Sequence, residues 1–403
     1  MKKIMGMVLA AVMAFSLSAC GGKKAATETE QTAAEKQTTT EAAATEERET
    51  KEQGEKRTIV DMRGEEVELP DKIERVAILD KGFLVQTMCA LGVSDRIVAS
   101  GDVIQGATSK TERDSLFLCP QLLELPQIGY PTAAVDYETL VAADPDIVIL
   151  RNSEYIKDSE ITAEAIDKIE NELKIPLVVI NGPGCYDEVK LETQYDGIRL
   201  MGELFEKEER AEEIISLMDK TISMIQERTA DIAEEDKPSV MYIGGLKGDE
   251  LTGTVWGANY GDAKFSEEIA NIKNVYPEHD AIRKVSAEQL IALNPDKIIL
   301  CTVSPDPEVF LSDGLYSPIS SITAVQNKDV SSIGLLTWWG DFRLEVPTIL
   351  LISAKSVYPE QFEDINVGTW LNEYHEALYN LSEEDAQQLK VTQQLDWVDG
   401  AGF

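Results

Sequence analysis

Two segments of the chain decide the fold: Glu138-Thr-Leu-Val-Ala-Ala-Asp-Pro-Asp-Ile-Val-Ile-Leu150 and Glu288-Gln-Leu-Ile-Ala-Leu-Asn-Pro-Asp-Lys-Ile-Ile-Leu300. They are identical at seven of thirteen positions. Each predicts a short helix that ends before proline, which lacks the amide and clashes with the preceding turn, and then a buried β-strand. Solenoid repeats have periods of only ~20–50 residues. This much longer period therefore predicts two similar lobes with a ligand cleft between them.

Strand patterns alternate with helix patterns on both sides of the repeat. In the first half, strands are predicted at 75–79, 96–100, 146–150 and 177–180. After Pro238, strands are predicted at 239–243, 297–300 and 324–333, followed by an apolar helix at 346–357 and an amphipathic stretch at 370–389 that caps the lobe. Such alternation is typical of the α/β class with mostly parallel sheets. We therefore expect an N-terminal α/β lobe at 58–190 and a C-terminal α/β lobe at 237–403.

The segment 191–236 between the lobes is predicted to be helical. From Glu203 to Glu235 it contains neither Gly nor Pro, and apolar residues recur at helical spacing. An unbroken helix over this stretch would be ~50 Å long. The sequence thus predicts two lobes joined by one long α-helix, with a small hinge motion rather than a wide closure.

The amino terminus indicates export. Lys2 and Lys3 precede an apolar run too short to span a membrane, and Leu17-Ser-Ala-Cys20 follows. These four residues resemble the lipobox of bacterial lipoproteins, in which the signal is removed before a cysteine that carries the lipid. We expect a signal peptide at 1–19, a lipid anchor on Cys20, and a disordered acidic linker at 20–57, because that stretch has almost no large apolar residue.

Charge and composition exclude several classes of protein. The formal net charge is −36, which argues against a nucleic-acid partner. Cys89, Cys119, Cys185 and Cys301 are widely spaced, which favours buried apolar roles over a zinc site or a disulfide scaffold. The chain has only two histidines, which is little material for a metal site or a Ser-His-Asp enzyme. We therefore expect no catalytic centre, no bound metal and no cofactor.

Taken together, the motifs resemble those of the substrate-binding proteins of iron-complex, haem and cobalamin ABC importers. The resemblance covers Thr58 to about Tyr379. It rests on the order of elements and on the two Glu-x-Leu...Pro-Asp units, Leu204-Phe-Glu-Lys-Glu-Glu-Arg-Ala211, Val285-Ser-Ala-Glu-Gln-Leu290 and Ala354-Lys...Tyr358-Pro-Glu-x-Phe362. It implies an extracytoplasmic receptor that delivers a solute to an ABC permease dimer with a cytoplasmic ATPase.

The resemblance assigns a role to the repeated glutamates. In the family, a glutamate on each lobe docks onto arginines of the two permease subunits, and the matching positions are Glu138 and Glu288. Two equivalent carboxylates suit a two-fold partner. The alternative is that each glutamate only favours the first turn of its helix through the helix dipole.

Ligand-binding candidates lie on the loops that follow the predicted strands, because open α/β sheets bind ligands at the carboxyl ends of their strands. Aromatic faces suit a large chelate, and Arg or Lys suits its anionic groups. Trp338 and Tyr186 also fit purely structural roles. The candidates are Lys81, Tyr130, Arg151, Tyr155, Tyr186, Trp256, Tyr260, Trp338, Trp339 and Arg343.

The broad aromatic set favours a metal chelate, that is, a ferric siderophore, haem or a corrinoid. Because no histidine cluster is present, ligation of haem iron would depend on tyrosine. A molybdate or tungstate oxyanion is the alternative ligand within the same fold. A surface-anchored α/β enzyme is the alternative of another class, since a fold alone does not settle function. An adhesion lipoprotein would leave the repeated helix unexplained.

Overall fold

The computed structural model describes residues 57–403, apart from 81, 102–105, 248–251, 258–260, 277, 279–281, 302–305, 313, 337–342 and 401–402. No helix in this part of the chain is long and apolar enough to cross a membrane. Several predictions fall outside it. These are the signal peptide 1–19, the lipidated Cys20, the linker up to residue 56, and the ligand-binding candidates Lys81, Tyr260, Trp338 and Trp339.

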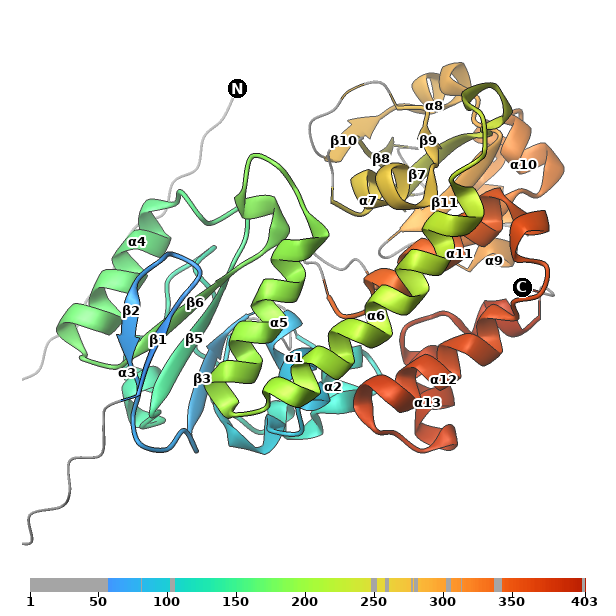
Figure 1. The fold of residues 1–403 in the computed structure, drawn as a ribbon. Helices are drawn as coiled ribbons and strands as arrows, with labels where there is room; N and C mark the ends of the chain where they lie inside the picture. The colour runs from blue at the N-terminus through green and yellow to red at the C-terminus, as the bar shows by residue number, and fades with distance from the viewer. Residues whose placement is uncertain are drawn as a thin grey trace, which may run out of the picture. The chain divides into compact units, whose positions relative to one another are not determined.

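The N lobe is built on a parallel sheet with the strand order β4-β3-β5-β6 (Figure 1). A short antiparallel pair of strands precedes this sheet, with Ile59 opposite Val67. The predicted alternation of strands and helices is confirmed. The elements are β1 Thr58–Val60, β2 Glu66–Glu68, β3 Val76–Leu79, α1 Phe83–Ala90, β4 Ile97–Ser100, α2 Asp114–Leu118, α3 Tyr137–Ala142, β5 Ile147–Asn152, α4 Glu160–Asp167 and β6 Leu177–Asn181.

Helices cover both faces of this sheet, which explains why its strands are almost entirely apolar. Successive side chains of β6 alternate between two cores, as the period of a strand requires. Val178 and Ile180 belong to a large core shared with the bridging helices and the C lobe. Leu177 and Val179 belong to a second core, which also contains Leu140 of α3.

The connection between the lobes consists of two helices, α5 Leu191–Phe205 and α6 Glu208–Thr229. The prediction of one unbroken helix from residue 203 to 235 was wrong, and α6 is ~33 Å long. The chain turns at Glu206, whose φ is +57°. The two helices cross so closely that a Cβ at Gly202 would lie 2.6 Å from the Cβ of Ala211. The helix α6 still bridges the lobes, because it contacts α5 at one end and α7 and α11 toward the other.

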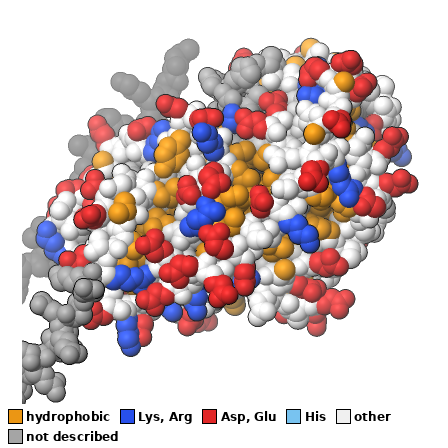
Figure 2. All heavy atoms as spheres, in the orientation of Figure 1, with side chains coloured by type: hydrophobic (Ala, Val, Ile, Leu, Met, Phe, Trp, Pro, Cys, Tyr) orange, Lys and Arg blue, Asp and Glu red, His pale blue; other side chains and the backbone are white. Residues whose placement is uncertain are grey.

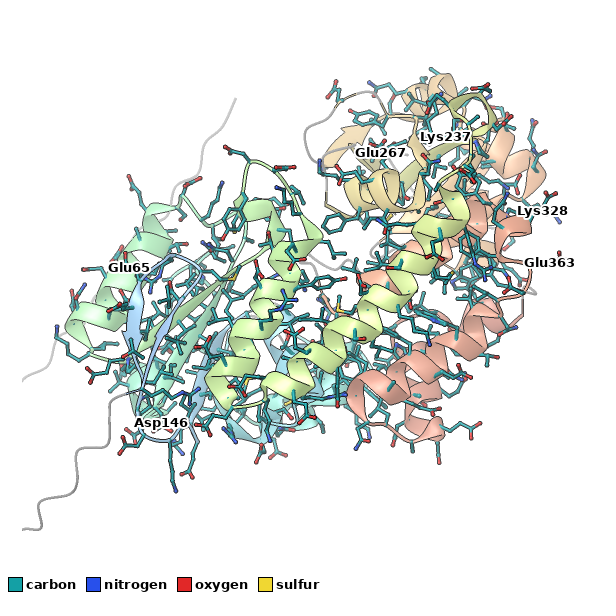
Figure 3. The ribbon with its side chains drawn as sticks, in the orientation of Figure 1. Glu65, Asp146, Lys237, Glu267, Lys328 and Glu363 are labelled. Atoms are coloured by element: carbon teal, nitrogen blue, oxygen red, sulfur yellow. The ribbon has the colours of Figure 1, made fainter. Side chains whose placement is uncertain are left out.

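The C lobe contains a six-stranded sheet with the order β10-β8-β7-β11-β12, and β9 also pairs with β7. It is mostly parallel, but β8 runs antiparallel to both of its neighbours. Lys237, labelled in Figure 3, lies just before the chain enters this sheet. The elements are β7 Ser239–Lys247, β8 Thr252–Trp256, α7 Gly261–Ala270, β9 Lys273–Asn274, β10 Ile282–Val285, α8 Ala287–Leu293, β11 Lys297–Cys301, α9 Pro307–Ser312, α10 Thr323–Asn327, β12 Val330–Ser332 and α11 Val346–Val357.

The predicted strand 324–333 was only partly right. Its first half forms the helix α10, and only β12 pairs with β11. The amide of Thr323 donates to Oδ1 of Asn294 at 2.9 Å, which ties the start of α10 to the loop of the repeat. Lys328, with φ +62°, then ends the helix. The hydrogen bond to the distant residue Asn294 thus stabilises the start of a helix where the local sequence pattern favoured a strand.

The last two long helices, α12 Val367–Tyr379 and α13 Glu383–Thr392, form a second connection between the lobes. They pack on the C lobe and also return to the N lobe, where α12 contacts α1 and α13 contacts α2 (Figure 1). Arg210 of α6 strengthens this junction. Its guanidinium donates to the carbonyls of Ala90, Ala377 and Leu378, and so caps the ends of α1 and α12 together.

The two copies of the repeat adopt the same local structure, one in each lobe. Leu140 of α3 and Leu290 of α8 are fully buried, which anchors each helix on its sheet. After the helix, Asp144 and Asn294 take the left-handed conformation, with φ of +47° and +40°. Both residues tolerate this conformation better than most, and the proline that follows each one stops the helix.

The aspartate of each Pro-Asp pair fastens a neighbouring strand. Oδ2 of Asp146, labelled in Figure 3, accepts hydrogen bonds from the amides of Glu74 and Arg75 just before β3, both at 2.8 Å. Oδ2 of Asp296 accepts from the amide and the hydroxyl of Ser239 at the start of β7, at 2.9 and 2.8 Å. The sequence repeat is therefore a structural repeat, as predicted.

Candidate functional site

The candidate site lies at the carboxyl edge of the N-lobe sheet. The strands β5 and β6 end in the neighbouring pair Asn152 and Asn181, whose side-chain amides are hydrogen-bonded at 3.0 Å. The backbone at Gly101, after β4, is packed so closely that a Cβ would lie 2.7 Å from the carbonyl oxygen of Gly129. Such edges of open α/β sheets are where ligands bind.

Arg151 lies at this edge near the end of β5 and is 1% exposed. Its guanidinium carbon lies 3.8 Å from the ring centroid of Phe83, a cation–π contact. Nη2 donates to Oε1 of Gln194 at 2.9 Å, and Nη1 donates to the carbonyl of Asn181 at 3.3 Å. These contacts hold a full positive charge beneath the edge of the sheet.

The tyrosine candidates of the N lobe differ in their surroundings. Tyr130 is buried and donates its hydroxyl to the carbonyl of Arg151 at 2.9 Å. The hydroxyl of Tyr186, a residue that is 41% exposed, accepts from Nδ2 of Asn181 at 3.2 Å. Tyr155, on the loop after β5, is 53% exposed. The structure therefore brings Tyr130, Arg151 and Tyr186 to one edge, and of these three only Tyr186 is exposed. Tyr155, on the neighbouring loop, is exposed as well.

Arg343 belongs to the C lobe but contacts the N lobe. Its Nη1 lies 2.9 and 3.1 Å from the two carboxylate oxygens of Asp114, and both side chains are almost fully buried. Nε2 of Gln86, on α1, donates to the same carboxylate at 3.0 Å. The guanidinium also packs flat on Gly82, where an added Cβ would lie 2.8 Å from it. Glycine is needed there for this close approach and for its φ of +152°.

The charges around this ion pair shift the pKa values of its neighbours. Burial lowers the pKa of Arg113, and the nearby Arg343 lowers it further, while Asp114 opposes both. Burial and then the negative charge of Asp114 raise the pKa of Glu345 to about 7. The hydroxyl of Tyr379 donates to Oε1 of Glu345 at 2.5 Å, which limits that shift. A buried polar network thus joins the two lobes beneath the candidate site.

The C-lobe candidates are less fully defined. Trp256, at the end of β8, is 1% exposed and stacks on Tyr242 with ring centroids 6.1 Å apart, so it lies in the core of that lobe and apart from the N-lobe candidates. The loops that follow β7, β11 and β12 contain residues 248–251, 302–305 and 337–342, which lie outside the described part of the chain. Within the described residues, no group of three or more His, Cys, Asp or Glu is placed to hold a metal ion.

Several polar residues of this region were not found from the sequence. Asp114, Gln86 and Gln194 belong to no sequence motif, and no local pattern indicates that they contact residues far away in the chain. Glu345 did leave a signal. Glu345 directly precedes the apolar helix α11, whose residues are almost all buried. A carboxylate at the start of such a helix is therefore expected to be buried as well.

Glu138 and Glu288, the predicted docking residues, occupy the same position in their helices. Each is the second residue of its helix and each side chain is exposed. The helices begin at Asp136 and Ser286, whose side chains accept from the amides of Thr139 and Gln289. The acidic character of the molecule is visible in Figure 2, where Asp and Glu are spread widely over the face shown.

The chain is similar to known proteins in sequence as well as in structure. Residues 76–334 match a family described as periplasmic binding protein. The molybdate-binding protein MolA of Haemophilus influenzae is 25% identical over 351 residues, covering 81% of this chain and 92% of MolA. YvrC of Bacillus subtilis, named an uncharacterised ABC transporter substrate-binding lipoprotein, is 25% identical over 57% of this chain and 67% of its own.

Among solved structures, the fold is similar to that of a periplasmic solute-binding protein from Veillonella parvula. The TM-score is 0.70 at 22% identity, and the match covers 86% of this chain and 99% of that one. This similarity concerns the fold.

Proposed function

The chain belongs to the periplasmic binding protein family, as the substrate-binding protein of an ABC importer, and from this premise we propose that it captures an anionic, metal-containing solute. Its fold and its relatives are those of substrate-binding proteins rather than enzymes, and its place is extracytoplasmic. Within the proposed class, a molybdate-type oxyanion is the first candidate. A metal chelate that carries anionic groups, such as a ferric siderophore, haem or a corrinoid, is the second.

The proposal of an anionic solute rests on one observation: arginines gather around the carboxyl edge of the N-lobe sheet in a chain of formal net charge −36. Arg151 lies at that edge, and Arg343, which is paired with Asp114, reaches it from the other lobe with Arg113 close by, so that three guanidinium groups face one carboxylate there. Guanidinium groups in a largely dehydrated site attract oxyanions and carboxylates far more strongly than they would in water.

The two candidate ligands have different support. The oxyanion is favoured by the similarity to MolA over most of its length and by the burial of Tyr130 and Trp256, which leaves fewer aromatic faces for a broad ligand. The chelate is favoured by the exposed Tyr155 and Tyr186 near the same edge. A large planar or apolar chelate needs such exposed rings, whereas a small oxyanion does not.

A thermal-shift panel on residues 20–403 distinguishes the candidates. Molybdate, tungstate, haem, cobalamin and ferric siderophores are offered separately, with sulfate as a control for simple anions. A ligand at one hundred times its Kd adds ~2.7 kcal/mol to the free energy of unfolding, which raises Tm by several degrees. A response to molybdate and tungstate, but not to sulfate, supports the oxyanion. A response to one chelate alone supports the second candidate, and no response to any of these oxyanions or chelates rejects the proposal.

We further propose that Glu138 and Glu288 dock onto the permease. Both are exposed, equivalent and held at the start of well-capped helices. Replacing both with Ala should abolish solute uptake and leave solute affinity unchanged. Loss of affinity in the double variant would assign these residues to the fold or to the ligand site instead.

The lipid anchor on Cys20 is also a proposal. It is supported by the lipobox-like sequence and by the name of YvrC, which describes a lipoprotein. Cells that express the full chain should incorporate labelled palmitate into it, and Cys20→Ser should release the protein from the membrane. Equal labelling of the two forms would reject Cys20 as the attachment site.

A further inference from the structure

Two of the four cysteines that the structure describes meet in the N lobe. Cys89 belongs to α1 and Cys119 directly follows α2, so they are 30 positions apart in the chain (119 − 89). The two helices contact each other. Cys119 is fully buried, whereas Cys89 is partly buried and packs against the same core. No spacing in the sequence indicates this meeting, because it depends on how α2 packs onto α1.

Two hydrogen bonds fix the segments on which these cysteines lie. Nε2 of Gln86, one helical turn before Cys89 and on the same face of α1, donates to Asp114 at 3.0 Å. Nε2 of Gln121, shortly after the second cysteine, donates to the carbonyl of Ser94 at 3.3 Å. Each cysteine therefore lies between two points at which its segment is tied to the other segment.

The two thiols also interact with each other. A hydrogen bond with the thiol of Cys89 is the largest cause that raises the pKa of Cys119, ahead of burial, and Ser94 acts in the opposite direction. Thiols within hydrogen-bonding reach need only small side-chain rotations to bring their sulfur atoms to the ~2.05 Å of a disulfide. The packing of α1 and α2 thus holds two thiols ready for oxidation.

We propose that Cys89 and Cys119 form a disulfide bond after export, by exchange with a disulfide oxidant of the extracytoplasmic compartment. Oxidising compartments outside the cytoplasm allow disulfides to form and persist, whereas the cytoplasm keeps thiols reduced. This inference rests on the extracytoplasmic place of the chain and not on the nature of its solute.

The exchange begins at Cys89, because Cys119 is buried and holds its proton more tightly. Cys89 loses its proton to solvent, and its thiolate attacks the disulfide of the oxidant, from which one thiolate leaves. Cys119 then loses its proton, attacks the sulfur of Cys89 and displaces the second thiolate. The two cysteines give up two protons and two electrons in all, and the oxidant is reduced from a disulfide to a dithiol.

The cross-link fastens the two helices that receive the other lobe. Asp114 of α2 pairs with Arg343 of the C lobe, and Gln86 of α1 donates to the same carboxylate. A covalent bond between α1 and α2 opposes their separation and so keeps this carboxylate in place. Closing the loop between the cysteines also restricts the unfolded chain, which stabilises the folded state.

Peptide mass spectrometry of the purified full chain tests the bond directly. The chain is incubated with oxidised glutathione, its remaining thiols are blocked with N-ethylmaleimide, and it is digested with trypsin. Peptides 82–96 and 114–151 carry Cys89 and Cys119, and peptide 175–190 carries Cys185 as an internal reference. The first two should be recovered as one linked species that reduction before blocking abolishes, and 175–190 should not be linked to either.

Two results of this digest would overturn the proposal. One is recovery of peptides 82–96 and 114–151 with both thiols blocked. The other is a stable mixed disulfide of glutathione on Cys89, because it would show that Cys119 does not reach the sulfur of Cys89.

Thermal unfolding with and without a phosphine reductant tests the effect on stability. Reduction should lower the Tm of the oxidised chain by a few degrees. Cys89→Ala, at a partly exposed position, should give the same Tm in both conditions, and the control Cys185→Ala should respond like the unsubstituted chain. A merely structural role for Cys89 predicts a lower Tm for Cys89→Ala but no effect of the reductant on the unsubstituted chain, and that pattern would reject the cross-link.

Discussion

Arg343 and Asp114 lie 229 positions apart in the chain and form a buried ion pair between the lobes, with Nη1 of Arg343 2.9 and 3.1 Å from the two carboxylate oxygens. Gln86 of α1 donates to the same carboxylate at 3.0 Å. The pair therefore holds Arg343 of the C lobe against the edge of the N lobe, beside Gly82. The same contact that joins the two lobes therefore also lies at the candidate site.

Removal of one partner of this pair should destabilise the protein strongly. Asp114→Ala leaves the guanidinium of Arg343 buried without its counter-charge, at an expected cost of ~3–5 kcal/mol in the free energy of unfolding. Replacing both residues, as Asp114→Leu with Arg343→Met, should recover most of that loss. Chemical denaturation measures both. The exposed pair Arg228–Asp364, which lies between α6 and the C lobe, provides the control, and Asp364→Asn should cost far less stability than Asp114→Ala.

Glu345 and His375 should give opposite dependences of stability on pH. The folded pKa of Glu345 is raised to about 7 from 4.5, so between these values only the folded state holds the proton and stability falls as pH rises. The folded pKa of His375 is lowered by burial to about 4 from 6.5, so in that window only the unfolded state holds the proton and stability rises with pH.

The two slopes are each ~1.4 kcal/mol per pH unit and nearly cancel between pH 4.5 and 6.5. Glu345→Gln should therefore unmask a stability that increases with pH, and His375→Asn one that decreases. Free energies of unfolding at half-unit steps of pH measure these slopes. Parallel curves for Glu345→Gln and the unsubstituted protein would show that Glu345 titrates at its ordinary pKa in the folded state.

Arg151 should serve both stability and the capture of an anion. Arg151→Met removes the charge and leaves the acceptors of Gln194 and Asn181 without their donor, so solute affinity and stability should both fall, affinity by about tenfold. Arg151→Lys keeps the charge but loses the planar fork, and should recover affinity more than stability. Isothermal titration with the responding anion gives the affinity, and thermal unfolding gives the stability.

Arg96 offers a matched control at the opposite edge of the same sheet. It lies before β4, where its guanidinium carbon is 5.6 Å from the ring centroid of Phe205 and Nη1 donates to the carbonyl of Ile73. Arg96→Met should lower stability without changing solute affinity. If Arg151→Met behaves in the same way, Arg151 is structural and the electrostatic proposal loses its main support.

The two aspartates of the repeat should make equal and independent contributions to stability. Asp146→Ala and Asp296→Ala each remove two hydrogen bonds to the start of a neighbouring strand, at an expected cost of ~1 kcal/mol each, because both carboxylates are reached by solvent. Because they lie in different lobes with no shared partner, the double variant should equal the sum. Denaturant titration of the single and double variants is the measurement, and a large deviation from additivity would contradict the view that each repeat acts within its own lobe.

The repeat and the strand patterns predicted the fold well because they are local signals. Leu140 and Leu290 mark a buried helix face, and the proline after each helix marks its end, so two lobes with parallel strands followed from the sequence. The break between α5 and α6 did not. Glu206 takes a left-handed conformation with no glycine to indicate it, and the close crossing of Gly202 and Ala211 depends on tertiary packing.

The candidate site was predicted only in part, for a related physical reason. Arg151 and Tyr130 were predicted to lie just after strands, where a periodic pattern locates the residue, and the structure brings them together, with Arg151 near the end of β5. Trp256 was predicted to lie on a loop, but it is the last residue of β8 and its side chain stacks on Tyr242 in the core, and the sequence does not determine which way a last strand residue turns. The Asp114–Arg343 pair joins residues far apart in the chain, and no local pattern marks such a contact.

The return of α12 and α13 to the N lobe affects how this protein is made. Synthesis of the N lobe ends well before residues 367–392 exist, and until then α1 and α2 lack the helices that cover them. Native packing of the first lobe therefore waits for the last part of the chain. A prematurely terminated chain would therefore leave both lobes incomplete rather than one lobe intact.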